Sequence, residues 1–440
     1  MKDTLQKYFQ KKSIYIPQEC SEVREKLQRL YGGCSAPQVA VVIPVKNEYP
    51  GIKDTLASIS ASASAGSLSH TAESLAHGTD SRASLHVVCV VNSCEDDDGD
   101  VKQNNAQMLA FLSKCVYENL FISVIDRTSS GNELPEKEGV GLARKIGMDY
   151  ALACGAEIIA CMDADTLVEE NYAEELFRFA QNHGKRSFAL VPFRHQKAST
   201  EKLQQAIDAY ENYMMLHSKK LREAGSPYWA PILGPSLVCT AEGYVSCGGM
   251  NKRVSGEDFY FLQSLVKIEI SSGCAHFDET SAQFDAPQNE KPAQANPVQV
   301  GEKCAQITHA RTQGTQTPRV CYSPCFLNTE VYPSARISDR VLFGTGPKLR
   351  ELTETISEKS KIECPIYPDR CYEAIKEFIE KKESCQNELA GFMNKENFLS
   401  VWNKICANNP SNPEKREIAF HIWFDGLKII RAIHAVETVL

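Results

Sequence analysis

Five short apolar runs, each separated from the next by a helix-like pattern, constrain the fold of this chain more than any other feature of its sequence. The runs are Val39–Val45, Leu85–Asn92, Leu120–Ile125, Ile158–Met162 and Ser187–Phe193. Runs of this length are too short for helices and are typical of strands buried on both faces of a parallel sheet. Because strand and helix alternate four times, the sequence predicts an α/β fold with a mostly parallel, doubly wound sheet and right-handed crossovers.

The fourth run leads into two aspartates that are one residue apart, Asp163 and Asp165. At the carboxyl end of a strand they would lie in the crevice where open α/β sheets bind ligands. Two carboxylates offer hard oxygen ligands to Mg²⁺ or Mn²⁺, and such an ion can hold a nucleotide diphosphate. The alternative is that Asp165 or Thr166 caps a helix expected over residues 168–181. Asp-x-Asp is a common pattern, so the spacing alone does not decide between the two.

Other polar residues follow the first two strands. The first strand stops at Lys46-Asn47-Glu48 and the second at Asn92. The acidic run over residues 95–100 is more typical of a solvated loop than of a metal site. A glycine-containing segment, Gly139–Met148, opens a helix and suggests phosphate binding. Its spacing is not the dinucleotide-binding fingerprint, so the signal is weak, and tight packing at Gly141 and Gly147 is the alternative explanation.

Two further groups of charged residues lie later in the chain. Glu257 and Asp258 begin a helix, where they either suit the helix dipole or serve as catalytic acids. Arg336 and Arg340 are four residues apart on a segment that carries glycine and serine. They could clamp a diphosphate through bidentate contacts, or belong to a surface loop of salt bridges. The residues alone leave these alternatives open.

Composition narrows the class of protein. The chain has 440 residues and a formal net charge of -8, which argues against nucleic acid as its main partner. The sequence has neither the apolar core of a signal peptide nor a run of about 20 apolar residues. It therefore predicts a protein without a transmembrane segment, placed in the cytoplasm, with peripheral contact with a membrane left open.

The chain is expected to divide into three units. These are an N-terminal helical segment over residues 1–38, a main domain over 39–348 and an α-helical C-terminal subdomain over 349–440, whose last helix has a strong apolar face. Two polar stretches, 60–84 and 279–318, show no sustained apolar period. They are predicted to be flexible insertions.

The order and spacing of five elements resemble the family 2 glycosyltransferases with the GT-A fold, over about residues 39 to 267. Val42–Glu48 is similar to the family's first strand and nucleotide-binding loop, and Val90–Ser93 stands at the place of its nucleobase-reading acids. Gly141–Gly147 is similar to its Gly-x-x-x-Ala-Arg-Asn-x-Gly helix, and Met162–Asp165 to its metal-binding Asp-x-Asp (DXD) motif. Gly248–Met250 and Gly256–Phe259 are similar to its acceptor-side elements.

This resemblance implies an inverting, hexosyltransferase-type enzyme that moves a single sugar from a UDP- or GDP-linked nucleotide-diphospho-sugar. The acceptor would be a hydroxyl of a glycan, a lipid or a small molecule. The resemblance also implies a Mn²⁺ or Mg²⁺ cofactor on Asp163 and Asp165, Asp258 as the general base, and Glu257 as the residue that orients the acceptor. The implied nucleotide contacts are Pro44, Lys46, Asn47, Glu48, Asn92, Arg144, Asp163, Arg336 and Arg340.

Two departures from the family pattern matter. Asn92 stands where an aspartate is customary, which leaves the nucleobase, uracil or guanine, undecided. The Gln-x-x-Arg-Trp motif, typical of processive members, is absent. The segment from Arg336 to Arg340 is expected to take over its diphosphate role, which fits the addition of a single sugar.

Two rival functions stay open. A nucleotidyltransferase also joins an α/β sheet to paired acids and a metal, but such enzymes usually have a Gly-rich, basic loop where this chain has Lys46-Asn47-Glu48. A non-catalytic GT-A-like scaffold would bind a partner through the C-terminal helices. The presence of every candidate catalytic acid argues against the scaffold.

Overall fold

A seven-stranded sheet with the strand order β10-β6-β7-β4-β1-β2-β3 forms the centre of the protein. The computed structural model describes residues 2–30, 38–66, 85–117, 119–135, 137–274, 276–278, 319–338, 344–355, 364–385 and 388–438. The strands of the sheet are β1 (Val39–Val45), β2 (Leu85–Asn92), β3 (Leu120–Arg127), β4 (Ile158–Cys161), β6 (Phe188–Leu190), β7 (Leu237–Thr240) and β10 (Cys325–Phe326). All neighbours pair in parallel except β7, which runs antiparallel to both β4 and β6. The predicted mostly parallel α/β sheet is confirmed.

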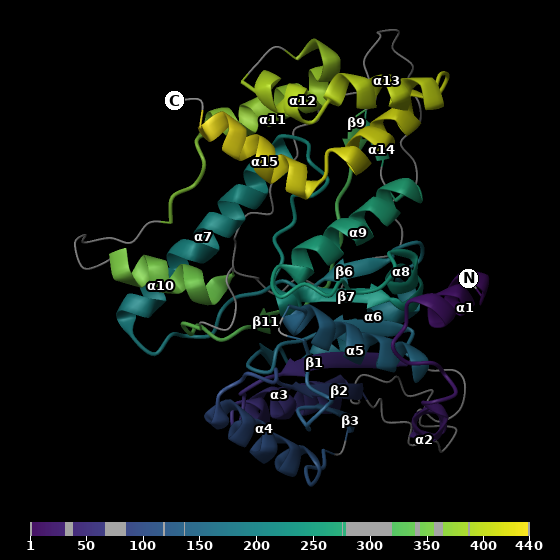
Figure 1. Cartoon of the computed structure of the whole chain (residues 1–440), viewed down its shortest axis with the longest axis vertical. Coiled ribbons are helices and arrows are strands. Elements are labelled where there is room, and N and C mark those ends of the chain that lie inside the picture. The colour runs from purple at the N-terminus through teal and green to yellow at the C-terminus, as the bar shows by residue number, and fades with distance from the viewer. Residues whose placement is uncertain are drawn as a thin grey trace.

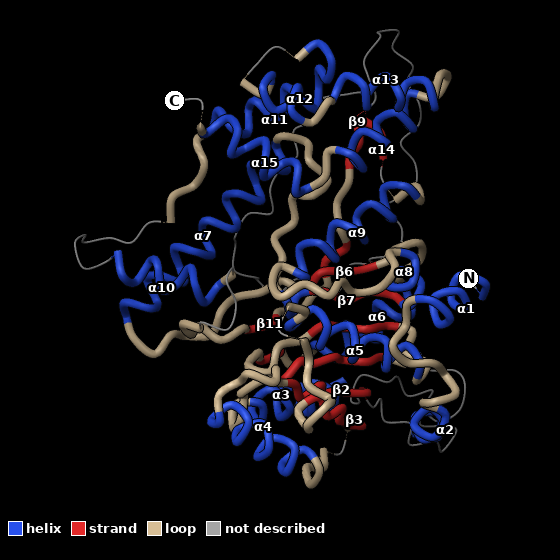
Figure 2. Tube along the Cα trace, viewed as in Figure 1, coloured by secondary structure: helices blue, strands red, loops and turns tan. Residues whose placement is uncertain are grey.

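Each face of the sheet has its own apolar core, because successive strand residues point to opposite faces. On β1, Ala40 and Val42 lie in one core, whereas Val39, Val41 and Ile43 lie in the other. Helices α5 (Gly139–Ala153), α8 (Ala241–Ser246) and α9 (Glu257–Ser271) cover the first face. Helices α3 (Ile52–Gly66), α4 (Gly99–Leu112) and α6 (Tyr172–Asn182) cover the second (Figures 1 and 2). This burial on both sides explains the apolar runs of the sequence.

A short ribbon beside the sheet corrects the expected helix over residues 168–181. Strand β5 (Leu167–Val168) pairs antiparallel with β11 (Val331–Tyr332), so α6 begins only at Tyr172. Its N-cap is Asn171, and the expectation that Asp165 or Thr166 caps this helix is wrong. The ribbon also brings the chain beyond β11 close to the aspartates that follow β4. A second ribbon pairs β8 (His276–Asp278) with β9 (Arg319–Cys321).

The flexible insertion predicted over residues 60–84 is wrong in its first part, because α3 continues to Gly66. Ser62 and Ala63 are buried there, and the Ser62 hydroxyl donates a hydrogen bond of 2.8 Å to the carbonyl of Ile59. Serine and alanine carry too little apolar surface to show the helical period in the sequence, yet they fit closely against a core. Residues 67–84 and the second predicted insertion, 279–318, lie outside the described residues.

Helix α7 (Glu201–Glu223) leads from the sheet to the C-terminal helices (Figure 1). It begins where the Thr200 hydroxyl accepts a hydrogen bond from the backbone N–H of Leu203 at 3.2 Å, as an N-cap does. Near its other end Leu221 packs into a core with Trp229 and the C-terminal helices. Neither α7 nor any other helix in the described part of the chain combines the length and apolar character needed to cross a bilayer.

The C-terminal region is α-helical, as predicted. It consists of α11 (Asp369–Lys381), α12 (Ala390–Lys395), α13 (Phe398–Asn408), α14 (Pro413–Trp423) and α15 (Gly426–Glu437). Its core centres on Phe378, whose ring centroid lies 4.8 Å from that of Phe398 and 4.9 Å from that of Phe424. Helix α10 (Thr345–Thr355) packs on α7 instead, so the expected boundary at residue 348 falls inside a helix. The division into three units stays a prediction.

The N-terminal helices α1 (Lys2–Lys11) and α2 (Ser21–Leu30) pack against the main body. A buried polar cluster holds α1 in place: Oδ1 of Asp149 accepts hydrogen bonds of 2.7 Å from the hydroxyls of both Tyr8 and Tyr244. Nζ of Lys145 lies 2.9 Å from the other oxygen of Asp149. The Tyr8 hydroxyl also lies so close to Gly249, at φ +83°, that a Cβ there would collide with it.

Candidate functional site

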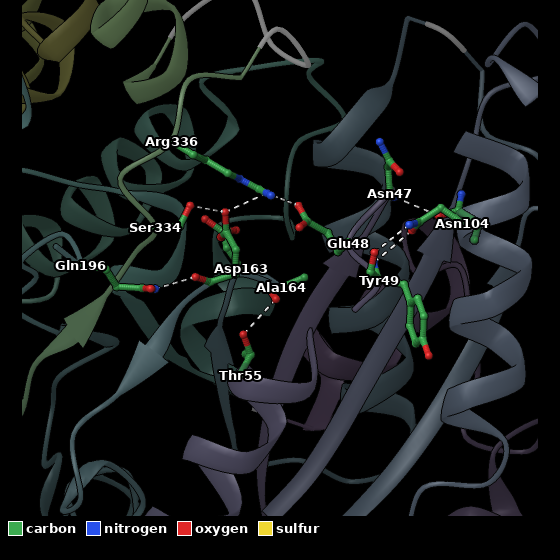
Figure 3. A network of polar contacts seen from close by, with 12 residues as sticks. Asn47, Glu48, Tyr49, Thr55, Asn104, Asp163, Ala164, Gln196, Ser334 and Arg336 are labelled. Carbon is green, nitrogen blue, oxygen red and sulfur yellow. Dashed lines mark hydrogen bonds and ion pairs between the residues drawn. The ribbon is translucent and has the colours of Figure 1, made fainter. Parts of the chain in front are cut away.

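The loop that carries Asp163 and Asp165 follows the carboxyl end of β4, as the sequence predicted. Its backbone is held from two sides (Figure 3). The hydroxyl of Thr55 donates to the carbonyl of Ala164 at 2.9 Å, and Nε2 of Gln196 donates to the carbonyl of Asp165 at 2.8 Å. These contacts fix the direction in which the two carboxylates are presented.

Arg336 joins three distant segments at this edge of the sheet. Its Nη2 lies 2.8 Å from Oδ2 of Asp165 and also contacts the carboxylate of Glu48. The hydroxyl of Ser334 donates to the same oxygen of Asp165 at 2.9 Å. Figure 3 shows Arg336 reaching from the chain beyond β11 to Glu48 on the loop after β1. The structure thus brings together three of the predicted site residues, Glu48, Asp165 and Arg336.

Negative charge is concentrated around Arg336. Burial raises the pKa of Asp165, Arg336 lowers it, and the charges of Asp163 and Glu48 raise it further, so that the net shift is upward. Burial lowers the pKa of Arg336, but the charges of Asp165 and Glu48 more than offset this effect and raise it. Glu48 and Asp165 thus contact the guanidinium of Arg336, and the charge of Asp163 acts on it as well.

Arg144, on α5, connects the aspartate loop to the start of α9. Its Nε lies 3.0 Å from Oε1 of Glu257, its Nη2 contacts Oδ1 of Asp163, and its Nη1 donates to the carbonyl of Met162 at 3.3 Å. The side chain is only 3% exposed. Burial lowers the pKa of Arg144, but the charges of Asp163 and Glu257 raise it above its usual value. The predicted nucleotide contact of Arg144 stays a prediction, and in the structure its guanidinium faces protein groups.

Gly234 lies directly against this pair of charges. A Cβ added at Gly234 would collide with Nη2 of Arg144 and lie 3.0 Å from Oδ2 of Asp163. The residue belongs to a short 3-10 turn, Gly234–Ser236, that precedes β7. A glycine is therefore required here by close approach and not by an unusual φ angle.

Glu257 and Asp258 begin α9, as predicted, but they face different surroundings. The carboxylate of Glu257 is buried and turned toward Arg144. Burial, followed by the charge of Glu257, raises the pKa of Asp258 to about 7, while Arg144 lowers it. The backbone N–H of Phe259 donates to Oδ1 of Asp258 at 2.7 Å. A carboxyl group with a pKa near neutrality is suited to accept a proton during catalysis.

The loop after β1 is tied to the middle of α4 and to the loop before this helix. Nζ of Lys46 lies 2.7 Å from Oδ1 of Asp97, in the acidic run that the sequence suggested to be a solvated loop. Asn47 has a left-handed backbone, with φ 58°, and its N–H donates to Oδ1 of Asn105 at 2.9 Å. Asn47 is exposed, so its side chain is open to a ligand.

Asn92 and Pro44 lie at the ends of neighbouring strands. Nδ2 of Asn92 donates to the carbonyls of Val45 and Val90, both at 3.1 Å, which joins the ends of β1 and β2. Pro44 lies next to Val90 in the parallel register. Arg340 lies outside the described residues. The nucleotide-binding roles of all these residues stay predictions.

The glycines of α5 are explained by packing. A Cβ at Gly147 would collide with Cγ1 of Val42 and lie 3.0 Å from Cγ2 of Val90, so glycine lets the helix approach the sheet. A Cβ at Gly141 would lie 2.7 Å from the backbone nitrogen of Arg253. Of the two interpretations of this segment, tight packing is the one that these contacts support.

The donor set at the aspartates fits a divalent cation that is shared with a ligand. In the part of the chain that the structure describes, no three His, Cys, Asp or Glu side chains form a complete metal cage. Mg²⁺ and Mn²⁺ are commonly held by one or two carboxylates together with substrate phosphates and water. Asp163 and Asp165, surrounded by an excess of negative charge, would be the residues that hold such an ion.

Several residues of the site were missed by sequence reasoning. Gln196, Ser334 and Gly234 all contact the aspartates or their partners, and Asn105 joins the loop after β1 to the end of β2. Two weak signals could have pointed to these residues: Ser334 is two residues from Arg336, and Gly234 precedes a proline. Gln196 lies in a polar stretch with no distinguishing pattern.

Residues 132–232 match the protein family described as Glycosyl transferase family 2. The match covers only the middle part of the chain, which is similar to glycosyltransferase family 2 over these residues. The matched segment contains α5, β4 and both aspartates of the Asp-x-Asp loop, whereas Asp258 and Arg336 lie beyond it.

Solved structures of TarS from S. aureus are also similar to this chain. TarS 1-349 shows 15% identity and a TM-score of 0.30, with 52% of this chain and 55% of that chain covered. Its complex with UDP-GlcNAc shows 10% identity and a TM-score of 0.34, with 88% and 91% covered. This chain spans about half the length of the first of these structures. No curated protein matches the chain. The fold assignment rests on the sheet itself, not on these similarities.

Proposed function

We propose that this chain is a family 2 glycosyltransferase that moves a single sugar from a UDP- or GDP-linked nucleotide-diphospho-sugar to an acceptor hydroxyl, with inversion at the anomeric carbon. The similarity of residues 132–232 to this family supports a nucleotide-sugar donor. The observation that supports the rest of the proposal is the connection from Asp163 through the buried Arg144 to Glu257, with Asp258 as the next residue. This connection supports the proposal that the acids after β4 and the acids that begin α9 belong to one site.

Asp258 is the general base in this proposal. Inversion in a single displacement requires a base on the face of the sugar opposite the leaving group. With a pKa of about 7, Asp258 is substantially ionised near neutral pH and still binds a proton well. It would take the proton of the acceptor hydroxyl as that oxygen bonds to the anomeric carbon. The bond from this carbon to the diphosphate breaks at the same time, and its electron pair leaves with the diphosphate.

On the donor side, Arg336 would contact the diphosphate, and Asp163 and Asp165 would hold Mn²⁺ or Mg²⁺. Such an ion, when bound, offsets the charge that builds on the leaving diphosphate. Arg144 keeps Asp163 in place, and Glu257 in turn holds Arg144. Glu257 is therefore a positioning residue in this proposal, whereas the sequence had suggested that it orients the acceptor.

Two measurements test the proposal. The first is hydrolysis of a panel of UDP- and GDP-sugars in the presence and absence of Mn²⁺ and Mg²⁺, with the anomer released from an accepted donor identified by NMR. The second is thermal stabilisation by UDP, GDP, CTP and UTP with Mn²⁺. Stabilisation by a diphosphate and release of the inverted sugar are expected. A preference for CTP or UTP with no sugar release would favour a nucleotidyltransferase, and no response to any nucleotide would favour a scaffold.

A further inference from the structure

Arg336 contacts Asp165, one of the two carboxylates proposed to hold a cation. Its Nη2 lies 2.8 Å from Oδ2 of Asp165, and the Ser334 hydroxyl donates to the same oxygen at 2.9 Å. The guanidinium also contacts Glu48, so it bridges two carboxylates as a divalent ion would. In Figure 3 the arginine lies across the space between the loop after β1 and the loop after β4.

We propose that Arg336 competes with the divalent cation for Asp165, so that the site takes the cation together with a nucleotide diphosphate and binds the free cation poorly. The identity of the nucleotide rests on the proposed function. The competition itself concerns only residues of this chain and the ion.

The competition follows from charge. A divalent ion on Asp165 and a guanidinium bridging Asp165 and Glu48 would repel each other strongly in this partly buried setting. The phosphate oxygens of a diphosphate can accept two hydrogen bonds from the guanidinium. Their negative charge also attracts the divalent ion. When a diphosphate arrives, Arg336 can leave Asp165 for the phosphate oxygens, and the carboxylate becomes open to the ion.

Exposure favours movement of Arg336 and not of its partners. The Arg336 side chain is 41% exposed, whereas that of Glu48 is 5% and that of Asp165 is 22% exposed. Arg144 is the opposite case, because it is almost fully buried and makes three contacts with Asp163, Glu257 and Met162. The two aspartates therefore differ: Asp163 has a fixed arginine partner, and Asp165 has an exchangeable one.

The test is a titration of the full-length protein with Mn²⁺ alone, read by the electron paramagnetic resonance signal of free Mn²⁺. The variant is Arg336→Met, which removes the charge and the donors from a partly exposed position. We expect Arg336→Met to bind Mn²⁺ roughly 5-fold or more tightly than the wild-type protein, the equivalent of one such ion pair. Repeating the titration with saturating UDP, and separately GDP, should tighten Mn²⁺ binding much more in the wild-type protein than in the variant.

The matched control is Arg194→Met, because Arg194 forms an exposed ion pair with Glu330, 3.2 Å away, and does not contact the aspartates. It should leave Mn²⁺ binding unchanged. Arg336→Gln provides a second variant of similar polarity, and the unfolding temperature of each variant shows that it is folded. Equal Mn²⁺ affinity of folded Arg336→Met and wild-type protein would overturn the inference. Binding of neither UDP nor GDP by either protein would count against the proposed function, and the titration with Mn²⁺ alone would still decide the competition.

Discussion

Nε of Arg144 lies 3.0 Å from Oε1 of Glu257, although 113 residues separate them in the sequence. The same guanidinium contacts Asp163, so one buried side chain fixes the acid after β4 relative to the acid that begins α9. In the proposed reaction these acids belong to the donor side and the acceptor side. A change at Arg144 should therefore disturb the alignment of the two substrates more than the binding of either.

Replacement of Gly234 by alanine should displace this arginine. The new Cβ would collide with Nη2 of Arg144, so we expect Gly234→Ala to reduce turnover at least about 10-fold and to lower stability by about 1–3 kcal/mol, as overpacking commonly does. Steady-state kinetics and urea denaturation measure the two effects. Gly391→Ala is the matched control, since a Cβ there meets nothing within 4 Å. If both variants showed the same turnover and stability, the close approach of Arg144 to Gly234 would not matter for function.

Asp258→Asn should separate catalysis from binding. The change keeps shape but removes proton acceptance, so turnover should fall roughly 100-fold or more while donor affinity stays near that of the wild-type protein. Kinetic assays and calorimetry with the donor nucleotide provide both numbers. Glu414→Gln, in the first turn of α14, is the control for a residue that only stabilises a helix terminus. Near-normal turnover of Asp258→Asn would refute its role as the base.

The activity should depend on pH through Asp258. Its ionised form is the active one, and burial raises its pKa to about 7, so turnover should rise as pH increases through about 7. Stability should show the opposite trend. The folded state holds the proton more tightly than the unfolded state, whose pKa is near 3.8, so this stabilising contribution is complete below about pH 4 and is lost as pH rises to about 7. Profiles of turnover and of unfolding free energy against pH measure the two effects. In the Asp258→Asn variant, the unfolding free energy should depend less on pH between about 4 and 7.

Asp165→Ala should abolish metal-dependent donor binding without unfolding the protein. Asp165 lies in a loop after a strand, so its loss opens no cavity in either core. Calorimetry with nucleotide, with and without Mn²⁺, should show the loss of the metal-dependent part only. Asp208→Ala, on the exposed surface of α7, serves as the control. Unchanged affinity in the presence of Mn²⁺ would exclude Asp165 as a metal ligand.

The sheet was largely predictable because its strands are buried on both faces. β1 and β2 consist almost entirely of apolar residues, and the polar residues that follow them mark the carboxyl edge. The position of Asp163 and Asp165 followed from the same rule. By contrast, the position at which α3 ends could not be predicted from the sequence, because Ser62 and Ala63 bury little apolar surface.

The contacts around Arg336 were not predictable from local pattern. They depend on β5 and β11, two strands of two residues each, whose paired residues Val168 and Val331 are 163 positions apart. Such short strands carry no period, and their pairing is decided by the tertiary structure. The same holds for Gly234, whose need for glycine arises from Arg144 on another element.

The contact between Tyr8 and Gly249 sets an order on the assembly of the protein. The Tyr8 hydroxyl fits only against residues that lie about 240 positions later, near Tyr244 and Gly249, together with Asp149 from the middle of the chain. During synthesis from the N-terminus, α1 is therefore made long before the surface on which it docks exists. Helix α1 can dock only after the sheet and helix α8 have formed. A label on α1 would therefore detect the end of folding of this domain and not its beginning.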